Sequence, residues 1–122
     1  MEKLIIIDNE VKYEVFPNEL LGYYNLYNSS SKLVESHKTG LMSWDFAMEF
    51  CKKMGDGWML PNKEQLYLMY KKKEYLKMLP LYGYWTRDEY DKENAHYQYF
   101  FTGNQYILDK KVPSFARPIR KI

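Results

Sequence analysis

Trp58-Met59-Leu60-Pro61 is the stretch of this sequence that decides the fold, because it separates two segments with helical spacing. Gly57 before it can reverse the chain, and Pro61 has no N–H to donate within a central strand. We expect Trp58 and Leu60 to face the core and Pro61 to end a short buried strand. The stretch would then join a helix-bearing half of the chain to a sheet.

The segment before this stretch predicts an amphipathic helix. Ser43 is a suitable N-cap, and Asp45 suits the positive end of the helix dipole. Gly55 and Gly57 can adopt the positive φ values that end a helix and reverse the chain. The apolar residues that recur on one face of this helix are Trp44, Ala47, Met48 and Cys51.

A second helix is predicted after Pro61. Asn62 can cap it, and Gln65 three residues later completes a variant of the capping box. The periodicity leaves open whether this helix continues beyond Lys71-Lys72-Lys73. Its apolar face consists of Leu66, Met69 and Tyr70.

Antiparallel strands are predicted at the N-terminal end. Residues 4–7 form an aliphatic run, Asp8-Asn9 has turn chemistry, and residues 11–15 alternate between apolar and polar, as in a hairpin. Residues 18–38 are irregular. We expect an extended stretch with Tyr23, Tyr24, Leu26 and Tyr27, followed by an exposed loop at Ser29-Ser30-Ser31.

Further strands are predicted towards the C-terminus. Tyr84-Trp85-Thr86 indicates a strand, and Asp88 to Asn94 a polar loop. A longer strand follows, and Gly103-Asn104 closes a hairpin with residues 105–108. Residues 115–119 indicate a last strand, so the fold class is α+β. One face of the longer strand carries Ala95, Tyr97, Tyr99 and Phe101.

The bulk composition is that of one folded domain. The chain has 122 residues without repeats, and 46% of them are hydrophobic, which argues against disorder. A net charge of +2 is too small to indicate a polyanion partner by itself. Cys51 is the only cysteine, so no disulfide can form within the chain.

The hydrophobic runs are short. The N-terminal run has four residues, fewer than the roughly 7–15 of a secretory signal core. No run approaches the ~18 apolar residues of a membrane-spanning helix. We therefore expect no signal peptide and no membrane insertion, with synthesis in the cytoplasm and incorporation into a virion as one further context.

Four motifs follow one another along the chain: Ser43-Trp44-Asp45 with Ala47 and Cys51, Gly57-Trp58-Met59-Leu60-Pro61 with Glu64 and Leu66, Tyr84-Trp85-Thr86, and Ala116-Arg117-Pro118-Ile119-Arg120. Their order resembles the lectin-like C-terminal domain family of the Legionella collagen-like adhesin. The resemblance covers about Thr39 to Arg120. It implies a C-type-lectin-like fold, with two helices packed on antiparallel β-strands.

The length and the lack of repeats and low-complexity linkers predict one domain over residues 1–122. The resemblance places a lectin-like core over 39–120, and the N-terminal hairpin and irregular extension over 1–38 lie outside it. Members of the broad fold occur in bacterial adhesins, phage receptor-binding tips and virion decoration proteins.

The sequence departs from the family pattern in its motifs. Met59 stands where the family usually has Arg, and Pro118 replaces the Cys that would pair with Cys51. The motifs of calcium-dependent sugar sites, Glu-Pro-Asn or Gln-Pro-Asp followed by Trp-Asn-Asp, are absent. We therefore expect any binding to be independent of calcium.

No motif in the sequence indicates catalysis. Cys51 with His96 or His37 has no spacing typical of a nucleophile and its base, and Cys51 lies on an apolar helical face. The acidic loop from Asp88 to Asn94 lacks the regular carboxylate spacing of a calcium loop. We expect no enzyme activity, no metal site and no cofactor.

Basic residues support an alternative function. Interleaved tyrosines could stack nucleic-acid bases beside these cations, although lysines near strand ends also keep sheet edges soluble. The alternative is a small intracellular nucleic-acid-binding protein. Its candidate residues are Lys71, Lys72, Lys110, Lys111 and Arg120, with Arg117 and Lys121 in the same C-terminal cluster.

The leading hypothesis is a non-enzymatic lectin-like binding or structural module. Its expected partner is a protein or glycan surface, in a homo-oligomer or a larger assembly such as a phage virion or an adhesin. Exposed aromatic and polar side chains would make the contacts. The candidate contact residues are Arg87, Asp88, Tyr90, His96 and Gln98.

Overall fold

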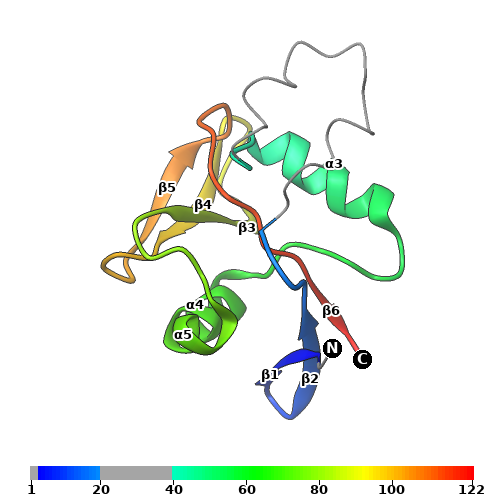
Figure 1. Ribbon diagram of the computed structural model, residues 1–122. Helices are drawn as coiled ribbons and strands as arrows, with labels where there is room; N and C mark the ends of the chain where they lie inside the picture. The colour runs from blue at the N-terminus through cyan, green and yellow to red at the C-terminus, as the bar shows by residue number, and fades with distance from the viewer. Residues whose placement is uncertain (1–2, 20–39) are drawn as a thin grey trace.

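The structure is a computed structural model that describes residues 3–19 and 40–122. It has a mixed fold of short helices and two antiparallel sheets, as predicted (Figure 1). Of the expected irregular stretch, residues 20–38, which include His37, lie outside the described residues. The elements are β1 Leu4–Asp8, β2 Val11–Val15, α3 Trp44–Met54, α4 Lys63–Lys71, α5 Lys73–Leu76, β3 Gly83–Glu89, β4 Asn94–Tyr99, β5 Gln105–Asp109 and β6 Ile119–Lys121.

The first sheet brings the two ends of the chain together. Its order is β1-β2-β6, and the predicted N-terminal hairpin is confirmed. Asn9 and Glu10 have φ values of 50° and 68°, which suit the tight turns that match strand twist. Val15 pairs with Ile119, so the C-terminal strand lies beside β2 (Figure 1).

The second sheet has the order β3-β4-β5. Strand β3 continues to Glu89, so the predicted polar loop is shorter than expected. The predicted strand through Phe101 is wrong at its end, because β4 stops at Tyr99 and Phe101 lies in the following turn. The last strand also starts later than predicted, at Ile119, while Phe115 makes an isolated bridge to Tyr84.

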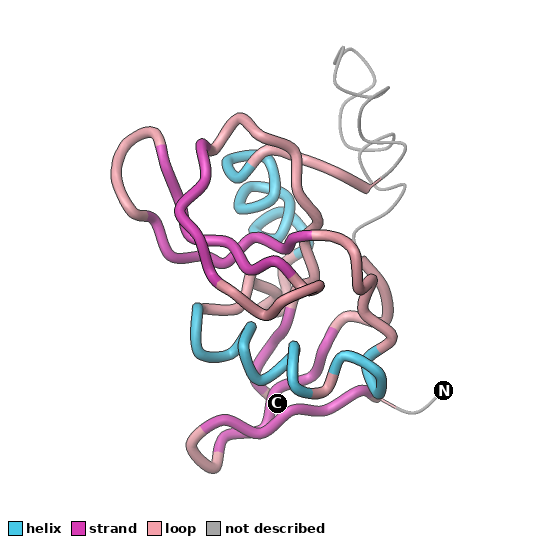
Figure 2. Tube along the Cα trace, turned by 90° about the vertical axis from the view of Figure 1, so that its left-hand side faces the viewer, coloured by secondary structure: helices cyan, strands magenta, loops and turns pink. Residues whose placement is uncertain are grey.

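Both predicted helices are confirmed, and they lie on opposite sides of the second sheet (Figure 2). The Ser43 side chain accepts a hydrogen bond from the backbone of Phe46 at the start of α3. At α4, Asn62 and Gln65 form a reciprocal capping box, with bonds of 2.7 and 2.9 Å. The second predicted helix does not continue unbroken past the three lysines. Helix α4 ends at Lys71, and the short α5 begins at Lys73.

The stretch from Met59 to Pro61 bonds to both sheets. The backbone of Met59 exchanges two hydrogen bonds with Ile119 of β6, at 2.9 and 2.8 Å. Two residues later, the carbonyl of Pro61 accepts a bond of 2.9 Å from the backbone N–H of Arg87 in β3. This segment therefore connects the sheets through its main chain.

The side chains of this stretch divide between two cores. Leu60 is buried among the residues beneath α3, which include Trp85, and Met59 packs against the cluster beneath α4. Trp58 was expected in the core, but it is half-buried. It packs edge-on against Phe16 and beneath the guanidinium of Arg120, 4.5 Å from the ring centre.

A buried ionic network fixes the chain after β2. Arg117 is 1% exposed, which contradicts its placement in a basic surface cluster. Its guanidinium donates to the carbonyls of Phe16 and Pro17 at 2.6 and 3.0 Å and lies 3.5 Å from the carboxylate of Glu19. The hydroxyl of Tyr84 donates to the same carboxylate. The buried charges of Arg117 and Glu19 thus compensate each other.

Replacing Arg117 by Met should lower the free energy of unfolding by about 3–5 kcal/mol, because Glu19 then stays buried without its cation. Urea denaturation measures the loss. The control Arg120→Met, which removes a more exposed pair with Glu14, should cost only about 1 kcal/mol. Adding Glu19→Gln to Arg117→Met should recover part of the loss, and equal losses for both arginine variants would contradict the network.

Candidate binding surface

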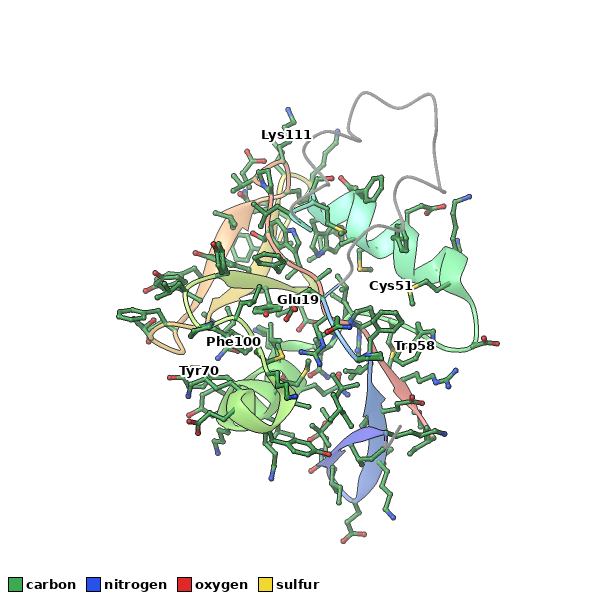
Figure 3. All side chains as sticks on the ribbon, viewed as in Figure 1. Glu19, Cys51, Trp58, Tyr70, Phe100 and Lys111 are labelled. Carbon is green, nitrogen blue, oxygen red and sulfur yellow. The ribbon has the colours of Figure 1, made fainter. Side chains whose placement is uncertain are left out.

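Four aromatic side chains gather at one end of the second sheet. The ring centres of Tyr97 and Tyr106 are 5.9 Å apart, and those of Tyr99 and Phe101 are 6.1 Å apart. Phe101 is 62% exposed and Tyr106 is 45% exposed. In Figure 3, side chains project from the free end of this sheet, away from α3. We call Tyr97, Tyr99, Phe101 and Tyr106 the aromatic platform.

Strand register assembles this platform. Tyr97 lies opposite Tyr106 in the β4–β5 pair, so both side chains emerge on the same face. Trp85 and Ala95 belong to the same face nearer to α3, where they are completely buried. The platform is therefore the continuation of the core face beyond the helix that covers it.

Gly83 makes room for the platform. A Cβ atom at this position would lie 2.3 Å from Cε2 of Tyr97, which is shorter than any tolerable contact. The ring of Tyr97 can therefore lie directly over the backbone of β3. Any larger residue at position 83 would move the ring.

The phenols of the platform lie close enough to interact. Burial raises the pKa of Tyr97, and the neighbouring phenols of Tyr106 and Tyr99 raise it further. The hydroxyl of Tyr97 accordingly keeps its proton at neutral pH and can donate a hydrogen bond. The surface combines apolar ring faces with polar edges, which suits contacts with a partner.

The structure separates the predicted contact residues. Tyr90 is 56% exposed, and its ring packs edge-on against half-buried His96 at 5.7 Å. Asp88 is half-buried and accepts a bond of 2.8 Å from the backbone N–H of Lys63 at the start of α4. Arg87 points to the Met59–Pro61 segment, where it donates to the carbonyl of Leu60 at 3.0 Å. Tyr90 and His96 are therefore in contact with each other, and of the two only Tyr90 is exposed.

Gln98 is not a contact residue, because it is completely buried. Its amide donates to the carbonyl of Gly103 at 2.9 Å and accepts from Gln105 at 3.0 Å. These bonds hold the β4–β5 hairpin closed. Gln98 was expected to be a contact residue as part of the strand that leaves the polar loop, but this strand packs against α4.

The aromatic platform was present in the sequence pattern. The alternation of Tyr97, Tyr99 and Phe101 was recognised as one face of a strand. What the pattern did not show is where α3 ends over that face. The exposure of the platform depends on where α3 ends. Without that position, the sequence could not favour the platform over the polar loop as the contact surface.

The basic residues do not form one continuous surface. Lys110 is 7% exposed, pairs with Glu89 and lies 4.6 Å from the ring centre of Trp44. Arg120 pairs with Glu14 at 3.0 Å. Two of the five residues proposed for nucleic-acid binding are therefore used in internal contacts.

The titratable groups show no catalytic arrangement in the described parts of the chain. Burial raises the pKa of the Cys51 thiol from 9.0 to about 12, so it is protonated at neutral pH. Asp91 in the acidic loop accepts bonds from the backbone of Glu93 and Asn94, which lower its pKa. Within residues 3–19 and 40–122, no three His, Cys, Asp or Glu side chains gather to hold a metal ion.

Within residues 3–19 and 40–122, the helices are too short or too polar to span a bilayer.

No model of a known protein family matches the sequence, and no curated protein matches it.

Solved structures with the same fold include botrocetin, a C-type-lectin-like protein. Its crystal structure has a TM-score of 0.54 to this chain at 13% identity, covering 97% of this chain and 96% of botrocetin. The complex of botrocetin with a mutant von Willebrand factor A1 domain gives a TM-score of 0.50 at 12% identity, with the same coverage. The chain therefore has a C-type-lectin-like fold.

Replacing Gly83 by Ala should displace the ring of Tyr97 and lower the free energy of unfolding by about 1–3 kcal/mol, as expected for overpacking. Urea denaturation and the NMR shifts of the Tyr97 ring measure the two effects. The double variant Gly83→Ala/Tyr97→Leu should recover much of the loss. A loss that is unchanged by removal of the ring would contradict this packing.

The Cys51 thiol should make stability fall at high pH. The folded thiol keeps its proton to about pH 12, whereas the unfolded thiol loses it near 9.0, so the unfolded state binds fewer protons between these values. The free energy of unfolding should then fall by about 1.4 kcal/mol per pH unit from this group. Urea denaturation between about pH 8 and 10.5 should show a shallower slope for Cys51→Ala, and equal slopes would contradict the prediction.

Proposed function

We propose that this chain is a non-enzymatic, calcium-independent binding module that contacts a protein or glycan surface through the aromatic platform. The single observation that carries the proposal is the exposure of Phe101 and Tyr106 beside Tyr97 and Tyr99. Contiguous exposed aromatic patches mark surfaces where a partner binds more often than single exposed rings do.

The chemistry of the platform fits a binding role. Tyrosine and phenylalanine supply a large contact area at little cost in side-chain entropy, and they are enriched at protein interfaces. Flat ring faces with hydroxyl edges also suit the alternating apolar and polar faces of a sugar. Neither contact needs a metal ion, which agrees with the absence of the calcium-site motifs from the sequence.

The fold comparison supports a binding module of this class. The solved botrocetin complex shows that a protein with this fold binds another protein, the von Willebrand factor A1 domain. The motif resemblance to the adhesin family supports a place in a larger assembly. We propose a virion decoration or receptor-binding protein, or an adhesin component, as that assembly.

Binding should depend on the two most exposed rings of the platform. The labelled domain is screened against a glycan array and a phage-displayed peptide library, both with EDTA present. For a ligand selected by either screen, Phe101→Ala/Tyr106→Ala should raise Kd at least about tenfold, because exposed aromatic anchors carry much of the binding energy. Calorimetry measures Kd, and circular dichroism confirms folding.

Tyr75 offers a matched control for this experiment. It is 50% exposed, similar to Tyr106 at 45%, but it lies on α5 beside residues of the first sheet. Tyr75→Ala should leave Kd within about twofold of the wild type, as expected for a residue outside the contact. A selected ligand that is lost with Tyr75→Ala and retained by the platform variant would overturn the proposal.

A further inference from the structure

Arg87 differs from the other arginines of the chain. Arg117 and Arg120 each form an ion pair with a glutamate, Glu19 and Glu14 respectively. No carboxylate pairs with Arg87 in the part of the chain that the structure describes, although Arg87 is half-buried. A partly buried cation without an anion is costly, because desolvation is not repaid by an opposite charge.

Neutral acceptors hold the Arg87 guanidinium in place. Its Nη1 lies 3.0 Å from the carbonyl oxygen of Leu60, 3.1 Å from Oε1 of Gln65 and 3.7 Å from the sulfur of Met59. All three contacts use the same nitrogen. Across residues 3–19 and 40–122, Nε and Nη2 have no hydrogen-bond acceptor. Two donors thus remain for a planar anion.

Arg87 lines a groove between α3 and the segment that carries Trp58. The groove encloses about 600 Å³, within the range of small-ligand sites. In Figure 3, Cys51 lies on the side of α3 that faces Trp58. The apolar lining of the groove consists of Met48, Cys51, Trp58, Met59 and Leu60.

The other charges of the groove lie at its rim. Asp45, Glu49 and Lys52 come from α3 and are exposed to solvent. Water screens their charges, whereas Arg87 is half-buried and keeps more of its field. The cation beside the apolar wall therefore dominates the choice of ligand.

We propose that this groove binds a carboxylate that carries an apolar group. The carboxylate would accept two hydrogen bonds from Nε and Nη2 of Arg87, the fork geometry that arginine offers to carboxylates. The apolar group would lie against Trp58 and Met48. Such a ligand is either a free apolar acid or the C-terminus of a peptide with an apolar last residue. The groove shares no residue with the aromatic platform. Ligand binding in the groove can therefore be tested independently of the proposed function.

Paired probes test the charge requirement on the wild-type protein. Octanoate and octanamide represent the free acid, and N-acetyl-leucine and its amide represent the peptide C-terminus. Titration in ¹H–¹⁵N NMR spectra should move the Nε–H signal of Arg87 and the indole signal of Trp58. Each acid should bind at least about tenfold more tightly than its amide, since hydrogen bonds to charged groups are the stronger ones. The tighter acid identifies the source of the ligand.

Two variants of Arg87 separate geometry from charge. Arg87→Lys keeps the charge without the fork and should weaken binding of the acid at least about fivefold, whereas Arg87→Gln should abolish its preference over the amide. Because Arg87 also bonds to Leu60, folding is checked by circular dichroism, and Lys71→Gln, an exposed lysine of α4 outside the groove, is the control that should change Kd less than about twofold. Equal binding of acid and amide by the wild type, or shifts confined to surface lysines, would overturn the proposal.

Discussion

The architecture depends on the main chain of Met59, Leu60 and Pro61. Its backbone groups bond to β6 at Met59 and to β3 at Pro61, and successive side chains enter different cores. A strand alternates its side chains between two faces, so one extended segment between two sheets can serve both cores. The helices then cover the two faces of the second sheet, and the buried pair of Arg117 and Glu19 holds the chain that leaves β2. Phe115, which bridges to Tyr84, makes another main-chain link, between the segment before β6 and β3.

Local patterns predicted those parts of the fold that depend on local chemistry. Ser43 and Asn62 marked helix starts because a capping side chain acts within one turn. The N-terminal hairpin followed from alternation around a two-residue turn, although the positive φ values fall on Asn9 and Glu10. The surroundings of Arg117 and Trp58 were mispredicted, because both side chains contact Phe16. Phe16 lies 101 positions from Arg117 in the sequence and is also far from Trp58. The sequence near a charged residue does not show whether a distant glutamate pairs with it in the fold, as Glu19 pairs with Arg117.

The same limit explains the outcome for the binding surface. Composition and spacing identified the tyrosines of β4 as one face, but exposure depends on which part of that face α3 covers. The contact residues were predicted in and beside the polar loop, since loop residues often carry function. In the structure, Asp88 helps to start α4 and Gln98 closes a hairpin. Polar residues there stabilise the fold, whereas Phe101 and Tyr106 remain exposed.

The pairing of β6 with β2 has a consequence for how the domain can be attached. Both described chain ends lie in the same small sheet, and Figure 1 shows them close together, away from the free end of β4 and β5. Any polypeptide joined at either end would leave the domain from this one side. A carrier attached at either end could thus hold the domain with the aromatic platform on the side away from the attachment. Surface display of engineered variants should tolerate a tether at either end for the same reason.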